Sequence, residues 1–305
     1  MKPRDIASYV FLALTWGLSF LVLLKTVQAF GWIGAVTLRA LIAGGALFLL
    51  AMATRRRLDF SAGWRHFAAV GATTVAAQLI GLSFATPRIG TAMAAILVAA
   101  IPLFSMILGQ LWGLERITLR GLSGLGVGAA GIGLLVGFPA VPVTPSFLIG
   151  CAASLFSSFS AAFGSNYVSR HLRSAGSLEV TSAAFLFGGL MTLPLLFFVP
   201  VPAMPRAVDL LYLAILSCVM SALTYVVYFR LVASIGATRT ISVEFAVTVV
   251  AVLVGTMLLK EPLSLVQGFG AVAIIAGCML VLDPFPRRAK SLPQAAPLPS
   301  ATPLV

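Results

Sequence analysis

The sequence predicts an all-α integral membrane protein in which ten transmembrane helices form two inverted five-helix repeats. Three observations support this fold class. The 305 residues are 60% hydrophobic and only 9% charged, whereas a soluble domain carries about 25% charged residues. The hydrophobic residues gather in ten long runs, and the second half of the chain repeats the first. No soluble fold has enough interior to bury so much apolar surface.

The ten predicted spans follow from the length of each apolar run, because about 20 residues of helix cross about 30 Å of hydrocarbon. They are residues 6–26, 32–53, 65–86, 89–112, 119–138, 145–168, 178–200, 207–229, 235–259 and 265–283. Long uninterrupted runs exclude a β-barrel, whose strands alternate apolar and polar residues. The Pro-rich segment 284–305 is too polar to span, and we expect it to be a disordered tail.

The basic residues predict the orientation. The net charge is +12, but Lys and Arg stand in short clusters between spans, with no basic face for nucleic acid. With both termini in the cytoplasm, 14 of them fall in cytoplasmic segments and 4 in outer ones. This bias agrees with the positive-inside rule for an even number of spans. We therefore expect a multi-pass protein of the bacterial inner membrane.

Nothing in the sequence predicts a metal or a cofactor. Cys151, Cys218 and Cys278 lie in apolar runs at spacings that fit no metal motif, and we expect no disulfide framework. His66 and His171 lie beside Arg in predicted loops, so solvated side chains are expected there. No nucleotide-binding motif GxxxxGK[ST] is present, and no HExxH motif indicates a membrane-embedded hydrolase. No catalytic residues are predicted.

An internal repeat becomes visible when the sequence is shifted by 146 residues. Ile89-Gly90 then aligns with Ile235-Gly236, and Glu115 aligns with Glu261. The glycine pairs Gly109–Gly255, Gly124–Gly270 and Gly131–Gly277 follow in phase. Because five spans per repeat is an odd number, the second repeat must be inverted. Inverted repeats that rock about a central site are the architecture of secondary transporters that work by alternating access.

The chain resembles the EamA-type transporters of the drug/metabolite transporter superfamily. The resemblance rests on Gly90 to Glu115 with Pro102 between them, on the Gly255–Glu261 copy, and on Trp16-Gly17 and Arg39. It implies two modules, residues 6–138 and 145–283, and an inner-membrane carrier that exports amino acids or other small metabolites. It also implies a central cavity lined by spans 1, 3, 4, 6, 8 and 9. The counterpart of Pro102 is Thr248 rather than proline, so a helix break there should be softer.

Two ionisable residues inside spans are the main candidates for function, because charge in the hydrocarbon costs at least about 2.5–3.5 kcal/mol. Arg39 lies roughly 10 Å into span 2 and Glu244 roughly 13 Å into span 9 at 1.5 Å per residue. Glu244 aligns with Val98, so the repeat is broken there. Three interpretations of Glu244 stay open: it binds a substrate ammonium, carries a coupling proton, or pairs with Arg39 or Arg239.

Polar and aromatic stripes on the spans predict the wall of a substrate cavity, because such faces must turn away from lipid. The candidates are Trp16, Ser19 and Phe20 in span 1, Gln78 in span 3, Ser221, Thr224, Tyr225 and Tyr228 in span 8, and Thr248 in span 9. The Ser154, Ser158 and Ser165 stripe of span 6 also suits an interhelical hydrogen-bonding seam.

Small residues and loop glutamates predict contacts of the scaffold. Gly124, Gly128 and Gly131 form a stripe that permits close helix packing, which we expect within one chain rather than between two. Glu115 and Glu261 begin short loops, three residues before Thr118 and Ser264, which are suited to capping the next helices. A structural role for both glutamates is favoured over proton coupling.

These observations predict a secondary carrier that exports a small organic metabolite, an amino acid or related compound, with proton coupling as an option. An efflux carrier for cationic drugs is the alternative. A membrane-embedded enzyme is disfavoured because the spans show no nucleophile–base pair and no set of metal ligands. A channel is disfavoured because no selectivity-filter motif is visible. The expected partners are the solute and the lipid bilayer, and a monomer is favoured over a homodimer.

Overall fold

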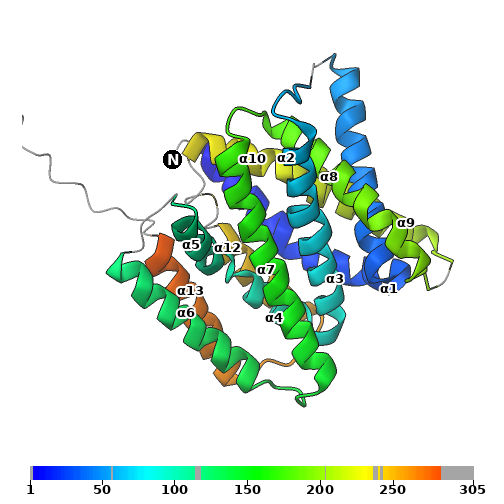
Figure 1. Ribbon diagram of the computed structural model, residues 1–305. Helices are drawn as coiled ribbons and strands as arrows, with labels where there is room; N and C mark the ends of the chain where they lie inside the picture. The colour runs from blue at the N-terminus through cyan, green and yellow to red at the C-terminus, as the bar shows by residue number, and fades with distance from the viewer. Residues whose placement is uncertain are drawn as a thin grey trace, which may run out of the picture.

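The computed structural model is all-helical in the part of the chain that it describes, with no strand there (Figure 1). It describes residues 3–55, 58–113, 118–202, 204–235, 240 and 243–282. The expected tail 284–305, Glu115 and Arg239 lie outside these residues.

The helices of the first half are α1 (Pro3–Ala53), α2 (Trp64–Val70), the π-helical η1 (Gly71–Ala77), α3 (Gln78–Ile89), α4 (Thr91–Val98), α5 (Ile101–Leu111) and α6 (Leu119–Gly137). Those of the second half are α7 (Pro145–His171), α8 (Ser177–Thr192), the 3-10 helix η2 (Leu193–Phe197), α9 (Ala207–Ala214), the π-helical η3 (Ile215–Leu223), α10 (Thr224–Ile235), α12 (Val243–Leu253), the π-helical η4 (Val254–Leu258) and α13 (Leu265–Leu282).

The ten predicted spans are found. Within the described residues, seven helices are long and apolar enough to cross a membrane, and Val243–Leu258 and Leu265–Leu280 are shorter apolar helices. One of the seven, α1, has 51 residues, or roughly 76 Å at 1.5 Å per residue. It is broken at Gly31, whose φ of 73° and ψ of 167° are not helical, so it supplies spans 1 and 2.

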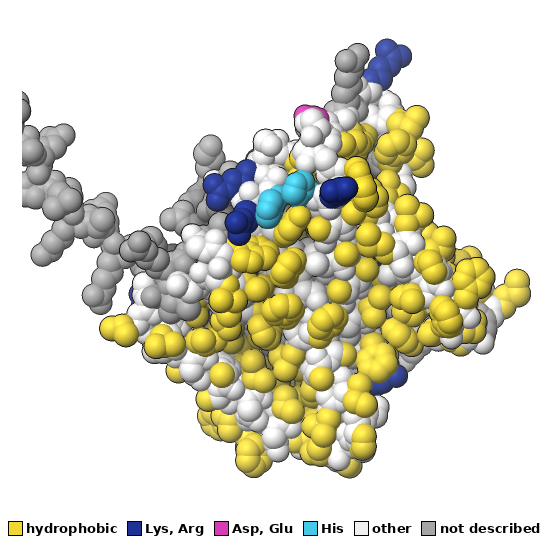
Figure 2. Space-filling view, in the orientation of Figure 1, with side chains coloured by type: hydrophobic (Ala, Val, Ile, Leu, Met, Phe, Trp, Pro, Cys, Tyr) yellow, Lys and Arg dark blue, Asp and Glu magenta, His cyan; other side chains and the backbone are white. Residues whose placement is uncertain are grey.

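The surface matches a protein solvated by lipid. Figure 2 shows hydrophobic side chains over most of the visible face, while the two histidines and several Lys and Arg side chains gather along its upper edge. Large apolar side chains such as Leu49, Leu111 and Phe269 are exposed. Exposure on this scale is expected where acyl chains, rather than water, cover the protein.

Contacts between loops and helix ends show which of these segments lie at the same end of the bundle. At the Asp5 end, Ser234 donates a hydrogen bond to Asp5 (2.9 Å), and His66 lies against Tyr167 (2.9 Å between Nδ1 and the hydroxyl). At the Gly31 end, the Ser264 hydroxyl donates to the carbonyl of Phe138 (2.9 Å). Each contact joins segments that ten alternating spans place on the same side.

The expectation that both histidines lie in loops was wrong. His66 lies in α2 and His171 is the last residue of α7. Their rings stack with centroids 5.1 Å apart, and His171 also stacks on Tyr167 at 4.3 Å. Helix ends packed together at the Asp5 end hold these side chains, which sequence spacing alone does not indicate.

One of the contacts between the two repeats is made by α6 and α13, which lie side by side in Figure 1. A Cβ atom added to Gly131 would lie 2.7 Å from the Gly270 carbonyl oxygen. One added to Gly277 would lie 2.5 Å from the carbonyl oxygen of Gly124. Residue numbers run in opposite directions across this contact, so the helices are antiparallel. In the repeat alignment, Gly124 corresponds to Gly270 and Gly131 to Gly277. Exchanging the two repeats therefore turns the Gly131–Gly270 contact into the Gly277–Gly124 contact, as a two-fold axis requires.

The most enclosed span, Thr91–Leu111, is divided into α4 and α5 at Ala99 and Ala100. Pro102 follows the break and cannot donate the hydrogen bond that a continuous helix needs. In the second repeat, α12 runs unbroken through Thr248. The softer break expected from Thr in place of Pro is therefore confirmed.

Side chains from three neighbouring helices satisfy the carbonyl groups near this break. Ser158 of α7 donates to the Leu97 carbonyl (3.1 Å), and Thr248 of α12 donates to that of Ala95 (3.2 Å). The Cys278 thiol of α13 donates to Ala99 (3.1 Å). Unsatisfied backbone groups are costly where no water is available, so these donors hold α4 in the middle of the bundle.

The opposite end of α4 is capped by Glu261 from the second repeat. Its carboxylate accepts hydrogen bonds from the backbone N–H groups of Thr91 and Ala92 (both 2.8 Å) and from the Thr91 hydroxyl. Gly90 (φ 83°) lies against the same carboxylate. The structural role expected for Glu261 is thus present. Thr118 and Ser264 cap α6 and α13 as expected, accepting from Gly121 and Gln267 (3.0 and 3.1 Å).

Replacing Gly277 with alanine should destabilise the protein by about 1–3 kcal/mol, because the new methyl group cannot fit between α13 and the α6 backbone. Gly133→Ala is the matched control, since nothing lies within 4 Å of its added Cβ. Melting temperatures in detergent measure both. An equal effect of the two variants would contradict the tight α6–α13 contact.

Glu261→Gln should destabilise the protein by about 1–2 kcal/mol, since the amide brings N–H donors toward the N–H groups of Thr91 and Ala92. Hydrogen exchange of these two amides should accelerate, which mass spectrometry of peptides from α4 can follow. Lys260→Gln is the control, because its side chain is exposed beside the cap. Unchanged exchange in Glu261→Gln would show that the cap is dispensable.

Candidate functional site

Three aromatic rings from two helices come together in the interior. Trp16 of α1 contacts Tyr225 and Tyr228 of α10, with ring centroids 5.6 and 5.4 Å apart. The spacing of 225 and 228 puts both rings on one face of α10. The edge-to-face and tilted arrangements are those that aromatic pairs favour. Trp16, Tyr225 and Tyr228 are called the aromatic cluster below.

Hydrogen bonds fix the cluster against η3 and α10. The Trp16 indole donates to the Thr224 hydroxyl (2.9 Å). That hydroxyl also donates to the Met220 carbonyl (2.9 Å) one turn earlier. Ser165 of α7 lies close to the Tyr228 hydroxyl. The rings therefore have defined positions before any ligand arrives, which lowers the entropic cost of binding.

Arg39 is buried in the second half of α1, 5% exposed, and its Nε donates to the Ser221 hydroxyl (2.6 Å). Ser221 in turn donates to the carbonyl of Leu216, five residues earlier (2.7 Å). A five-residue step is the spacing of a π-helical turn, and it lies within η3. The guanidinium lies in the neighbourhood of Tyr225.

Glu244 lies in the first turn of α12, within electrostatic range of both Tyr225 and Tyr228. Among the described residues, its carboxylate has no hydrogen bond and no ion pair, so the expected pairing with Arg39 is not found there. Arg239, the other expected partner, lies outside those residues. Tyr225 therefore has both a cation, Arg39, and a carboxylate, Glu244, in its neighbourhood.

The structure thus brings together seven of the eleven residues selected from the sequence: Trp16, Arg39, Ser221, Thr224, Tyr225, Tyr228 and Glu244. Of the other four, Ser19 donates to the Trp16 carbonyl in its own helix (2.7 Å), and Phe20 is buried in a core cluster with Leu12 and Val247. The Gln78 carbonyl accepts from Ser157 (2.8 Å).

Thr248, the fourth of these, does not fit a cavity wall. It is 2% exposed, and its hydroxyl is committed to the Ala95 and Glu244 carbonyls. The Thr248 hydroxyl is turned toward α4 at this depth, where it adds a second hydrogen bond to the Ala95 carbonyl. Ser154 and Ser158 likewise donate to α4 carbonyls (3.4 and 3.1 Å), which agrees with the seam interpretation of span 6.

Two contributors to the site were missed. Phe185 of α8 packs edge-on against Tyr225 with centroids 5.1 Å apart, although span 7 was not expected to line the cavity. Phe185 is surrounded in the sequence by other apolar residues, so nothing there marks it as a residue of the site. The π-helical turns of η1 and η3 were also missed, although they occupy corresponding places in spans 3 and 8. π-helical turns are frequent at functional sites.

The fold and site define a class: a polytopic helical membrane protein of two inverted repeats with a polar aromatic site between them. The sequence profile of the EamA-like transporter family matches residues 6–137 and again residues 148–283. The chain belongs to the EamA-like transporter family.

Several known proteins are similar in sequence to this chain over nearly its whole length. Protein PecM of Dickeya dadantii is 29% identical over 96% of this chain and 97% of its own length. An uncharacterized transporter of Archaeoglobus fulgidus is 26% identical over 90% and 98%, and the inner membrane transporter YedA of Escherichia coli K12 is 26% identical over 88% of both. One crystal structure superposes with a TM-score of 0.66 over 92% of this chain and 96% of that one, at 15% identity, which shows a shared fold.

A double-mutant cycle should detect the bond between Trp16 and Thr224. Trp16→Phe and Thr224→Val should each destabilise the protein, and the double variant should lose less than their sum, by about 0.5–1.5 kcal/mol. Denaturant titration in mixed micelles measures the free energies of unfolding. Additive losses would mean that the indole does not bond to Thr224.

Proposed function

We propose that the chain is a monomeric secondary carrier that exports a small organic solute with an amino group, an amino acid or related compound, by alternating access. The observation that carries this proposal is the Glu244 carboxylate, which has no ion-pair partner among the described residues and lies beside the aromatic cluster. Transport itself is the activity of the family to which the chain belongs.

The site suits a ligand with an ammonium group. A carboxylate in a low-dielectric interior needs a counter-charge or a proton. Aromatic faces attract cations within about 6 Å of the ring centroid. A solute ammonium placed between Glu244 and the aromatic cluster would satisfy both. A solute carboxylate could bind Arg39, whose remaining N–H groups have no hydrogen bond among the described residues.

The position of the site suits alternating access. Trp16 and Arg39 belong to the first repeat, while Tyr225 and Glu244 belong to the second. A solute bound between them would contact both repeats, and rocking of one repeat against the other would expose it to either side. The α6–α13 contact joins the repeats away from the site and provides a fixed element for such motion.

Proton coupling follows from competition at Glu244. The carboxylate is costly to leave bare in this interior, so it holds either a proton or the solute ammonium. Because one excludes the other, return of the empty carrier would bring a proton inward for each solute released outward. Because one proton moves inward for each solute that moves outward, the net charge of the solute determines how the membrane potential contributes to the driving force for transport.

An efflux carrier for cationic drugs is the second candidate. It is favoured by three aromatic rings beside a carboxylate and by the commitment of the Arg39 Nε to Ser221. The two candidates differ in whether a solute carboxylate is required. For either, we propose the bacterial inner membrane and cytoplasmic termini, supported by the distribution of Lys and Arg and by the inner membrane relative.

Transport in proteoliposomes tests the proposal, with a panel of radiolabelled amino acids and organic cations, with and without a pH gradient. At least one amino acid should be carried faster with the gradient. Glu244→Gln should reduce gradient-driven transport about tenfold or more, because a charge-assisted bond to the ammonium is lost.

Asp59→Asn is the matched control, since Asp59 is an exposed carboxylate between α1 and α2. Normal rates and normal pH dependence in Glu244→Gln would leave the carboxylate with a structural role only. Carriage of organic cations without any amino acid would favour the second candidate.

A further inference from the structure

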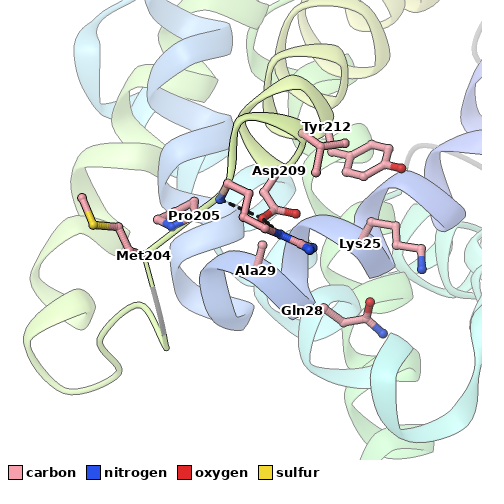
Figure 3. Close-up of a pocket in the computed structure, with 9 residues that line it drawn as sticks. Lys25, Gln28, Ala29, Met204, Pro205, Asp209 and Tyr212 are labelled. Carbon is pink, nitrogen blue, oxygen red and sulfur yellow. Dashed lines mark hydrogen bonds and ion pairs between the residues drawn. The ribbon is translucent and has the colours of Figure 1, made fainter.

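A cavity of about 490 Å³ lies at the Gly31 end of the bundle, apart from the aromatic cluster. Figure 3 shows Lys25, Gln28 and Ala29 of α1 on one wall, with Asp209 and Tyr212 of α9 on the other. Met204, Pro205, Arg206 and Val208 complete the lining. The cavity lies within the size range of sites for small organic ligands.

The lining is cationic. Lys25 and Arg206 contribute two positive charges, and Asp209 contributes the one negative charge. Asp209 is already engaged, because its Oδ2 accepts from the Arg206 backbone N–H (2.9 Å) and from the Arg206 Nε (3.3 Å). This arrangement caps α9, and it leaves the Arg206 side chain 81% exposed at the mouth of the cavity.

Hydrogen-bond donors remain free on both walls. The bond to Asp209 uses only the Nε of Arg206, so the terminal guanidinium N–H groups have no partner among the described residues. The Lys25 ammonium likewise has no hydrogen bond or ion pair within that part of the chain. An arginine fork and a lysine ammonium on separate walls suit a tetrahedral oxyanion, which can accept from several directions.

Apolar side chains border the cavity. Met204 and Val208, two apolar residues of the lining, are 95% and 43% exposed. Such side chains beside a cationic cavity at the end of transmembrane helices match an amphiphile whose charged group lies at the interface and whose acyl chains lie in the bilayer.

We propose that this cavity binds a negatively charged phosphate group, supplied by an anionic phospholipid headgroup or by free phosphate. Lys25 and Arg206 supply the charge, while Gln28 and Tyr212 supply neutral hydrogen-bonding groups. Bound phosphate would join α1 to the start of α9, and so the first repeat to the second, next to the break at Gly31. The site does not depend on the identity of the transported solute.

Thermal unfolding of the purified full-length protein in a neutral detergent tests the site with three probes. These are short-chain phosphatidylglycerol, short-chain phosphatidylcholine and inorganic phosphate. A ligand that binds only the folded state raises the melting temperature. Phosphatidylglycerol should raise it by about 2 °C or more, and phosphatidylcholine should raise it much less.

A shift with phosphatidylglycerol alone would identify the lipid headgroup as the source, and a shift with phosphate as well would identify the phosphate group from either source. The double variant Lys25→Gln, Arg206→Gln should lose the shift, while Lys260→Gln, an exposed lysine outside the cavity, should keep it. If the double variant does not fold, Lys25→Glu alone should reduce the shift by reversing one charge. Equal shifts with both lipids, no shift, or a full shift in the charge variants would overturn the proposal.

Discussion

The bundle is organised around one constraint, the need to satisfy the backbone of α4 in an environment without water. Its first N–H groups are bonded by Glu261 from the loop after η4, and carbonyls at and just after its end accept from α7, α12 and α13. Four separate segments are thereby held at fixed distances from one helix. Since α12 carries Glu244 and α7 carries Ser165, the same bonds also position part of the site.

The architecture was predictable because hydrocarbon imposes few solutions. A chain with this composition must form helices about 20 residues long, and the odd number per repeat requires inversion. The break before Pro102 and the unbroken helix at Thr248 follow from proline's missing donor. What sequence could not reveal was the π-helical turns of η1 and η3. Their hydrogen bonds span five residues instead of four, and no residue type marks them.

The site was predictable in its residues more than in its bonds. Scarcity of charge singled out Arg39 and Glu244, and periodicity placed Tyr225 and Tyr228 on one face. The absence of an ion pair between Arg39 and Glu244 was not predictable, because Arg39 donates instead to Ser221, 182 residues away in sequence. Thr248 shows the limit of the method. A hydroxyl facing inward serves a cavity or a neighbouring carbonyl, and only the fold tells the two apart.

The glycine contact between α6 and α13 has a consequence for how such a chain could have arisen. A surface that meets its own counterpart across a two-fold axis needs only one sequence, since the same patch serves both partners. A polypeptide of half this length, inserted in both orientations, could therefore have assembled as an antiparallel homodimer. Fusion of two copies would then have freed each half to diverge, and a site with one Glu244 and one Arg39 has the kind of asymmetry that a homodimer cannot encode.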